Sequence, residues 1–574
     1  MKKTWLAALA AMMLMVGFAA CQDEVPPYLV IEKIDVDEDD IHGKVIMGVT
    51  DPSEVPEQVK IPNGILGIYR KTFSGCTSLN SVTIPKSMKE IDYAAFDGCE
   101  DIDVTYMGTL KDWCAVDWDS YLLKNAKRIM LSDGTDLKKL TEITANDLAG
   151  VTKIGENAFS RCESLESVEI PKSVKKISYG AFGGCKNIAV VTYKGSFKDW
   201  CAVDGDPDLI SYAKRIMLSD GTDLKKLTEI TADDLAGVTH IGMGAFARCT
   251  SLESVEIPKC VTEISYAFGG CKNIAVVTYK GSFKDWCAVE WDRNLISYAK
   301  RIVLSDGTDL KKLTEITADD LAGVTRIGEN AFRVCTLLES VEIPKCVKEI
   351  EIGAFGDCKN IAMVTYKGSF KDWCAVDWDP VLIKCAKRIM LSDGTDPREV
   401  TEITANDLAG VTRIGENAFS DCTSLESVEI PKCVKEIGIG AFGGCAKLTS
   451  MTISSSVTYI GHNAFRNCTS LASVTIPGSV PKLGEVAFAG CTSLADVTIA
   501  DGVTAIGNAA FEGCTSLASV GIPRSVTRIY GNAFSNCSPN LKIQYDGTKS
   551  QWNAISGIKP KVTVQCSDGI ITVK

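Results

Sequence analysis

One short string limits what this chain can fold into more than any other feature. Ala-Phe-x-x-Cys occurs fourteen times, once with Thr72 in place of the alanine. Its phenylalanines are Phe73, Phe96, Phe159, Phe182, Phe246, Phe268, Phe332, Phe355, Phe419, Phe442, Phe465, Phe488, Phe511 and Phe534. Successive copies lie 22 or 23 residues apart within groups and 63 or 64 residues apart between groups. A fixed period of this length predicts a stack of small repeats rather than several globular domains.

The apolar pattern of a single repeat shows why the units must stack. The repeat that starts at Phe488 continues with Cys491 and Leu494, and its segment Val497-Thr498-Ile499 alternates as a half-buried strand does. A unit of 23 residues is too small to enclose a core, so its apolar edge is covered only by the next unit. The sequence therefore predicts one continuous core along the stack.

The repeat also resembles a known family. Ile476-Pro477-Gly478-Ser479-Val480 and the segment from Ala510 to Leu517 are similar to the consensus of the BspA-like leucine-rich repeats. The resemblance covers roughly residues 60–545. It implies a repeat solenoid, a right-handed leucine-rich-repeat coil with one long parallel β-sheet, and the sequence adds α/β-hairpin inserts that interrupt it.

Four inserts of about 41 residues separate the early pairs of repeats. Each carries a Tyr-x-Gly turn, a short helix with Asp-Trp, and an Asp-Gly turn typical of hairpins, so we expect it to bulge from one side of the coil. The first tryptophans, Trp113, Trp200, Trp286 and Trp373, are predicted to pack on the solenoid, with sugar stacking as the alternative. A second tryptophan (Trp118, Trp291, Trp378) is Gly205 in one insert, which favours a more exposed place.

The 24 cysteines follow the repeat, since fourteen of them occupy the repeat site. Equivalent positions in neighbouring coils stay near the coil spacing of about 4.8 Å. A disulfide needs about 3.5–4.5 Å between Cβ atoms. We therefore predict a ladder of buried thiols, with disulfides or a metal site as the less favoured interpretations. Cys260, Cys346 and Cys433 follow Pro-Lys and are expected near a turn.

The first residues have the form of an export signal. Lys2 and Lys3 precede an apolar run that ends at Ala20, and Cys21 follows directly. This arrangement resembles the bacterial lipobox, whose cysteine carries acyl chains, and the acidic residues after it resemble a surface-export signal. We expect lipidation at Cys21 and a lipid-anchored, outward-facing protein of the outer membrane. A plain signal peptide is the alternative.

These features divide the chain into four parts. We expect a signal peptide at 1–20, an N-terminal tether or cap at 21–58, a leucine-rich-repeat solenoid at 59–545 and a C-terminal cap at 546–574. The inserts fall near 106–150, 193–237, 279–323 and 366–410. The acidic residues between Asp35 and Asp40 are interpreted as a solvated loop, with a calcium site as the alternative.

Charge and motif content argue against catalysis and against nucleic acid. The net charge is −12, from 61 basic and 73 acidic residues, and only three histidines are present. No serine-hydrolase, phosphate-loop or zinc-protease motif occurs. Two repeats and the insert that follows them form a block. Carboxylate pairs recur with every block, whereas a catalytic pair would occur once. We therefore predict no enzyme activity, no cofactor and no metal, and we interpret His240 as a surface residue.

The repeats instead offer a binding face. Strand residues on either side of a buried valine point outward, and in successive blocks these are Ser167 and Glu169, Ser254 and Glu256, Ser340 and Glu342, and Ser427 and Glu429. We expect lysines such as Lys172 nearby. The resemblance implies adhesion to host extracellular proteins or to other microbial surfaces. A surface glycan-binding lipoprotein and a structural spacer without a ligand are the alternatives.

Overall fold

The computed structural model describes residues 26–34, 43–557 and 562–571. Cys21, the export signal and the acidic residues from Asp35 to Asp40 lie outside them. Within the described ranges no helix has the length and apolarity that a membrane span requires. The chain forms two compact units, Met1–Lys280 with Trp291–Val303 and Gly281–Glu290 with Leu304–Lys574.

The first strand of each repeat joins a ladder of mainly parallel strands. In the first unit it contains β3 (Gln58–Lys60), β5 (Ser81–Ile84), β7 (Ile102–Tyr106), β8 (Ala126–Leu131), β9 (Glu142–Ile143), β11 (Ser167–Ile170), β13 (Val190–Tyr193), β14 (Arg215–Met217), β15 (Glu229–Ile230), β17 (Ser254–Ile257), β19 (Val276–Tyr279) and β20 (Arg301–Val303). In the second it contains β21 (Glu315–Ile316), β23 (Ser340–Ile343), β25 (Met363–Tyr366), β26 (Arg388–Leu391), β27 (Glu402–Ile403), β29 (Ser427–Ile430), β31 (Ser450–Ile453), β33 (Ser473–Ile476), β35 (Asp496–Ile499), β37 (Ser519–Ile522), β39 (Lys542–Tyr545), β41 (Thr563–Cys566) and β42 (Gly569–Ile571).

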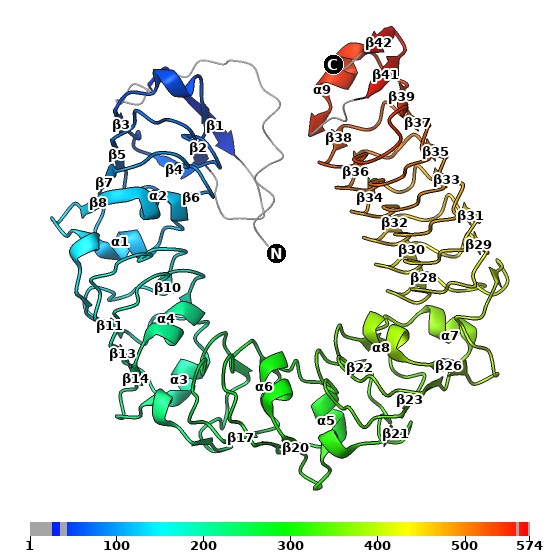
Figure 1. Ribbon diagram of the computed structural model, residues 1–574, viewed down its shortest axis with the longest axis horizontal. Coiled ribbons are helices and arrows are strands. Elements are labelled where there is room, and N and C mark those ends of the chain that lie inside the picture. Colours follow the sequence, from blue (N-terminus) through cyan, green and yellow to red (C-terminus); the bar gives the residue numbers. More distant parts are fainter. Residues whose placement is uncertain (1–25, 35–42, 558–561, 572–574) are drawn as a thin grey trace. The chain divides into compact units, whose positions relative to one another are not determined.

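A second ladder consists mostly of two-residue strands. Its members are β4 (Ile65–Ile68), β6 (Glu90–Ile91), β10 (Lys153–Ile154), β12 (Lys176–Ile177), β16 (His240–Ile241), β18 (Glu263–Ile264), β22 (Arg326–Ile327), β24 (Glu349–Ile350), β28 (Arg413–Ile414), β30 (Glu436–Ile437), β32 (Tyr459–Ile460), β34 (Lys482–Leu483), β36 (Ala505–Ile506), β38 (Arg528–Ile529) and β40 (Ser556–Gly557). In the insert-free part of the second unit the two ladders run along opposite flanks of the stack (Figure 1). The predicted solenoid of parallel strands is confirmed.

The repeat phenylalanines form the centre of the core. The rings from Phe419 to Phe534 are stacked with centroids 5.1–5.6 Å apart and planes within 11° of parallel. Wherever a second repeat follows directly, the backbone N–H of the phenylalanine donates to the alanine carbonyl of the next coil, for example Phe488 to Ala510 at 2.8 Å. Ring spacing and backbone bonding therefore set the same distance between coils, close to the general spacing of paired strands.

The cysteine ladder is buried as predicted. Cys491 donates its thiol to the Phe465 carbonyl at 3.2 Å, and the same contact recurs along the stack. Burial raises the pKa of the Cys271 thiol to about 11. All cysteines of the described ranges are free thiols. Cys260 takes the place of the turn serine and contacts the Val238 carbonyl, as Ser456 contacts that of Val434.

The inserts continue the stack instead of bulging from it. Strand β14 pairs in parallel with β13, and Asp204 forms a parallel bridge to Lys176 of the short ladder. Across the Asp220-Gly221 turn, Met217 and Asp223 form a single antiparallel bridge. Strand β15 is then the first strand of the next sheet. The long ladder is consequently divided into several sheets at the inserts.

Each insert carries two short helices, of which the sequence indicated only the first (Figure 1). The first of each pair is α1 (Leu110–Cys114), α3 (Phe197–Cys201), α5 (Phe283–Cys287) and α7 (Phe370–Cys374), and the second is α2 (Ser120–Asn125), α4 (Pro207–Tyr212), α6 (Arg293–Tyr298) and α8 (Pro380–Cys385). Helix α3 begins with a capping box between Ser196 and Asp199. Short 3₁₀ turns, Leu137–Lys139, Leu224–Lys226 and Leu310–Lys312, follow the Asp-Gly turns of the first three inserts.

Two side chains join each insert to the phenylalanine ladder. Before an insert, a buried aspartate replaces the missing alanine carbonyl, so that Phe182 N–H donates to Asp206 at 2.9 Å. After it, a tryptophan replaces the missing phenylalanine N–H, so that Trp200 Nε1 donates to the Ala245 carbonyl at 2.8 Å. The same pair of contacts occurs in the other inserts, through Asp119, Asp292 and Asp379 and through Trp113, Trp286 and Trp373. Core packing of the first tryptophans is therefore confirmed.

The expectation of an exposed second tryptophan is wrong. Trp118, Trp291 and Trp378 are all buried. Trp118 stacks on Trp113 at 3.6 Å between ring centroids and donates its indole N–H to the Trp113 carbonyl. Its replacement by Gly205 in one insert reflects a change within the core and not surface tolerance.

Antiparallel strands lie at both ends of the described chain. Strand β1 (Leu29–Ile34) pairs antiparallel with β2 (Gly43–Val49), which pairs in parallel with β4. Near the other end α9 (Lys549–Ala554) buries Trp552, and β42 pairs antiparallel with β41. Such strands cover ladder edges that would otherwise be open to pairing with other chains.

Replacing Phe488 by alanine tests the ring stack. We expect a loss of about 3–5 kcal/mol, because the cavity lies between Phe465 and Phe511 in an otherwise close-packed core. In a nearest-neighbour stack, hydrogen exchange should increase mainly in the adjoining coils. Thr498→Ala, at an exposed position of the neighbouring strand, is the control. Equal loss of protection along the whole unit would contradict local coupling.

Asp206 tests the junction through its pH dependence. Burial raises the pKa of this carboxyl to about 6, above the ordinary value of 3.8. Its stabilising contribution is therefore greatest below pH 4 and is lost as the pH rises through 6, by up to roughly 3 kcal/mol. Hydrogen exchange at the Phe182 amide, corrected for intrinsic rates, should show this slope in the wild type and not in Asp206→Asn. Equal slopes in the two proteins would contradict the assignment.

Candidate functional site

The predicted binding rows of serine and glutamate lie on the long ladder. In β11, β17 and β23 the serine and the glutamate are half-exposed on either side of a buried valine, and in β29 the glutamate is exposed. These are Ser167, Glu169, Ser254, Glu256, Ser340, Glu342, Ser427 and Glu429. The strand geometry thus places them outward, and whether they bind a partner stays a prediction.

Their carboxylates are already engaged. Lys194 Nζ lies 2.7 Å from Glu169, and equivalent pairs join Lys280 to Glu256 and Lys367 to Glu342. The hydrogen bond from Lys194 lowers the pKa of Glu169. Lys172, expected beside these glutamates, instead pairs with Asp199 at 3.1 Å. At Glu429 no such lysine follows, since Ser454 stands there.

A repeated ion cluster marks the short ladder. Arg326 of β22 lies 2.8 Å from both Glu290 and Glu351 and 3.4 Å from Glu349. In an earlier block His240 holds the equivalent place, 3.4 Å from Asp204 and from Glu263. His240 is half-exposed, which agrees with the surface interpretation. The recurrence in several blocks indicates a structural surface network and not a catalytic group.

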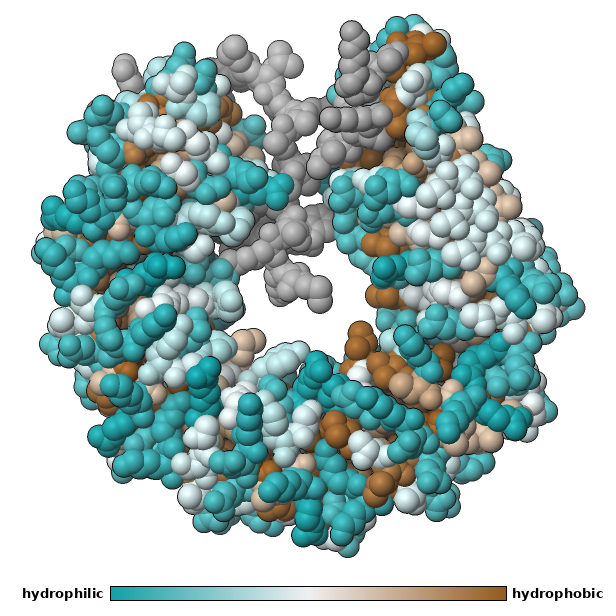
Figure 2. All heavy atoms as spheres, in the orientation of Figure 1, coloured by the Kyte–Doolittle hydropathy of each residue, from teal (hydrophilic) through white to brown (hydrophobic). Residues whose placement is uncertain are grey.

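Beside this network, one turn position carries large exposed apolar side chains. They are Tyr93, Tyr179, Met243 and Tyr266 in the first unit and Ile352 and Ile439 in the second, and we call them the apolar flank. Tyr179 is 78% exposed and Ile352 is 68% exposed. Figure 2 shows scattered apolar residues on a mostly hydrophilic surface. Exposed apolar groups that recur at one position are typical of interaction surfaces.

Backbone conformation explains why these side chains stay exposed. The residue after five of them is in the left-handed region, as at Gly180 with φ of 68° and Gly353 with φ of 76°, whereas Tyr266 is itself in that region with φ of 48°. This turn directs the chain into Ala-Phe, which enters the core, and leaves the preceding side chain outside. A Cβ at Gly180 would also come within 2.6 Å of Asn157 Oδ1. At this turn the glycine is therefore constrained, whereas the residue before it stays exposed.

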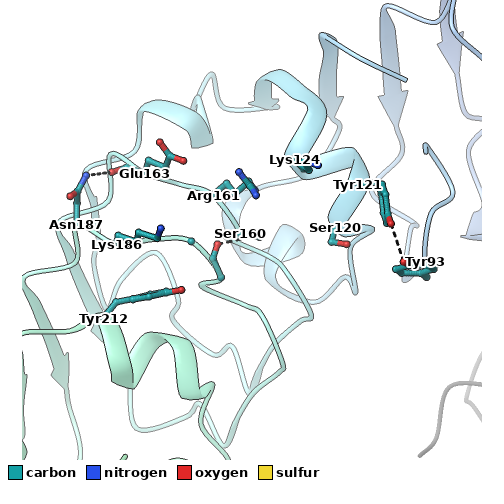
Figure 3. Close-up of a pocket in the computed structure, with 12 residues that line it drawn as sticks. Tyr93, Ser120, Tyr121, Lys124, Ser160, Arg161, Glu163, Lys186, Asn187 and Tyr212 are labelled. Carbon is teal, nitrogen blue, oxygen red and sulfur yellow. Dashed lines mark hydrogen bonds between the residues drawn. The ribbon is translucent and has the colours of Figure 1, made fainter. Parts of the chain in front are cut away.

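A groove of about 860 Å³ opens in the first unit between α2 and the following repeats (Figure 3). Its lining comprises Tyr93, Ser120, Tyr121, Lys124, Ser160, Arg161, Glu163, Gly183, Gly184, Lys186, Asn187 and Tyr212. The Tyr93 and Tyr121 hydroxyls are 2.9 Å apart and their rings meet edge to face. Sequence reasoning missed both this groove and the apolar flank. The turn residue before Ala-Phe was a usable signal for the flank, because the second repeat of each of the first five pairs has tyrosine or isoleucine there, whereas the first repeat has a charged residue in every pair except that of Met243.

Within the described ranges, no group of three or more His, Cys, Asp or Glu side chains is arranged to hold an ion. The acidic residues from Asp35 to Asp40, considered for calcium, lie outside those ranges.

The repeats match a described family. The BspA type leucine rich repeat region is matched in six copies, over residues 55–113, 135–200, 222–287, 308–374 and 412–542. These segments cover more than half of the chain. No curated protein matches it.

Several solved structures of leucine-rich repeat proteins are similar to the chain. A leucine rich cell surface protein of Faecalibacterium prausnitzii is 21% identical over 94% of this chain and 99% of its own, with a TM-score of 0.28. A leucine-rich repeat protein of Bacteroides ovatus is 19% identical over 91% and 99%, with a TM-score of 0.22. One from T. pallidum is 35% identical over 24% and 66%, also with a TM-score of 0.22.

Proposed function

Because the chain belongs to the BspA-type leucine-rich repeat family, we propose that it is a non-enzymatic, lipid-anchored protein of the bacterial cell surface whose repeats bind partner proteins. Leucine-rich repeat proteins generally bind other proteins, and the family is one of repeat scaffolds. The observation that carries the proposal is the apolar flank, because its tyrosine, methionine and isoleucine side chains are exposed outside the buried core.

The surroundings of the flank support a protein partner. Ile352 adjoins Glu351, which is held by Arg326, so the apolar side chain has a polar, ion-paired neighbour. Apolar contact points within a polar rim are the usual anatomy of protein interfaces. Recurrence of the contact point in successive blocks permits a multivalent interaction in which single weak contacts add up. The proposed partners are host extracellular proteins or proteins of other microbial surfaces.

Glycan binding is the second candidate. All insert tryptophans are buried, so they offer no ring to a sugar. Tyr93, Tyr179 and Tyr266 remain exposed and keep the candidate open. The serine–glutamate rows are a second candidate face for proteins, although their engaged carboxylates make them weaker than the flank. A structural spacer without a ligand would require neither the apolar flank nor the serine–glutamate rows.

Binding to an array of matrix proteins and glycans tests the proposal. The unacylated chain from about residue 25 onward should bind protein spots, and Tyr179→Ser with Ile352→Ser and Ile439→Ser should reduce that binding by about tenfold or more. Leu337→Ser, which is 50% exposed outside the flank, is the matched control. Binding confined to glycans would favour the second candidate, and silence on both sets would favour the spacer.

The anchor rests on the N-terminal sequence alone. We propose that residues 1–20 are removed, that Cys21 carries the acyl chains, and that residues 21–58 tether the stack of 59–545 to the outer membrane. Each buried methylene contributes about 0.8 kcal/mol to anchoring. Cys21→Ser should therefore release the protein from the membrane fraction. A variant that still sediments with membranes would contradict lipidation.

A further inference from the structure

We propose that the groove in the first unit is a binding site for a short acidic saccharide, that is, a sugar chain carrying carboxylate or sulfate groups. The site shares Tyr93 with the apolar flank but is otherwise polar and basic, and it goes beyond the proposed protein binding. Its volume of about 860 Å³ falls within the range of roughly 300–1,000 Å³ that is usual for ligand clefts.

The groove is locally basic although the whole chain is acidic. Lys124, Arg161 and Lys186 line it and are exposed, against the Glu163 carboxylate in the lining and the Asp208 carboxylate beside Gly183. In the described part of the chain, none of the three cations has a carboxylate within ion-pair distance, whereas Lys153, Lys172 and Lys194 of the neighbouring coils are each paired. The net charge of the chain is −12. Three unpaired cations that face one cleft in such a chain favour an anionic ligand.

Backbone geometry holds the central cation in place. Arg161 adopts a left-handed conformation with φ of 58°, and its backbone N–H donates to the Gly183 carbonyl at 2.7 Å. A Cβ at Gly184 would lie 3.3 Å from Arg161 Cγ, so the glycine leaves room for the arginine stem. Lys124 comes from α2 and lines the same cleft (Figure 3). The cations are thus contributed by separate coils that the stack fixes relative to one another.

Tyrosines stand at the two ends of the groove (Figure 3). Tyr93 and Tyr121 fix each other through their hydroxyls and their edge-to-face rings at one end. Tyr212, the last residue of α4, lies at the other. A tyrosine combines an apolar ring face, on which the C–H face of a sugar ring packs, with a hydroxyl for hydrogen bonding. Asn187 adds an amide whose N–H donates to the Glu163 carbonyl and whose oxygen is an acceptor for ligand hydroxyls.

This combination of residues occurs once in the chain. At the positions equivalent to Tyr121 and Lys124, the next insert has Asp208 and Ser211. An acidic and a neutral side chain thus replace an aromatic and a basic one. Structural repeats preserve side chains that the stack needs, so a set that departs from the repeat points to a ligand and not to packing.

A saccharide fits better than an acidic peptide. The floor contains the glycines Gly183 and Gly184, and no aliphatic side chain is among the residues that line the groove. An extended peptide would also need an open strand edge to pair with, whereas neighbouring β11 and β13 are both paired on each side. A polyhydroxylated chain instead uses rings, amides and cations spaced along a shallow cleft.

The test is binding of the full unacylated chain to defined oligomers. The probes are a six-sugar oligogalacturonate, a heparin hexasaccharide, neutral maltohexaose and a hexaglutamate peptide. We expect at least one acidic saccharide to bind with an affinity that falls as salt rises, and Lys124→Ser with Arg161→Ser and Lys186→Ser to weaken it on the order of tenfold or more. The two acidic sugars distinguish carboxylate from sulfate as the recognised group.

Matched variants separate this proposal from the protein-binding one. Arg248→Ser with Lys272→Ser removes the equivalent cations of the next block and should leave saccharide binding unchanged, as should Ile352→Ser with Ile439→Ser in the apolar flank. Tyr121→Asp, which installs the residue of the next insert, should weaken it. Equal binding of maltohexaose or hexaglutamate, no binding of either acidic sugar, or an unaffected triple variant would overturn the proposal without bearing on the flank.

Discussion

The hydrogen bond from each repeat phenylalanine to the alanine carbonyl of the next coil is the contact on which the rest of the structure depends. It is 2.7–3.0 Å long wherever two repeats follow each other, and it sets the spacing at which the rings stack and the thiols reach the preceding carbonyl. Where an insert removes one partner, Asp206 or Trp200 and their equivalents supply the missing acceptor or donor. A buried backbone group without a partner costs about 1–3 kcal/mol, so these substitutions let the inserts enter the stack.

The sequence predicted the repeats, the buried thiols and the first tryptophans, because these are properties of one repeat and its neighbour in the stack. The inserts were predicted less well. Each has only four copies and no strong apolar period, and the role of Asp206 depends on where the chain returns in space. From the sequence alone, Asp206 is interpreted as an ordinary helix cap. It does have that role, because its carboxylate accepts a hydrogen bond from the Asp208 N–H.

The candidate surfaces illustrate the same division. Alternation along a strand correctly placed Ser167 and Glu169 outward, but it did not show that Lys194 and the Ala145 N–H occupy the carboxylate. The apolar flank depends on a left-handed turn that no periodicity marks. The groove depends on three coils brought together by the stack, and no single segment of the sequence contains its residues. Predicting a binding surface of a repeat protein therefore requires the residues of several neighbouring coils to be considered together.

A stack that accepts inserts as coils has rigid surfaces on which single side chains vary. In the first unit this yields a basic groove in an acidic chain, and in both units it yields exposed tyrosine, methionine or isoleucine at a fixed turn. Such variation changes recognition without changing the fold, because the varied side chains do not take part in the phenylalanine ladder.

Hydrogen exchange at the junction glycines tests the integration of the inserts most directly. The amides of Gly155, Gly242, Gly328 and Gly415 each donate to a cysteine carbonyl of an insert helix at 2.7 Å, in positions where a Cβ would overlap the insert backbone. If the inserts are coils of the stack, these four amides should be protected as strongly as Phe465 or Phe488 in the insert-free repeats. Exchange at the rate of surface loops would contradict the account.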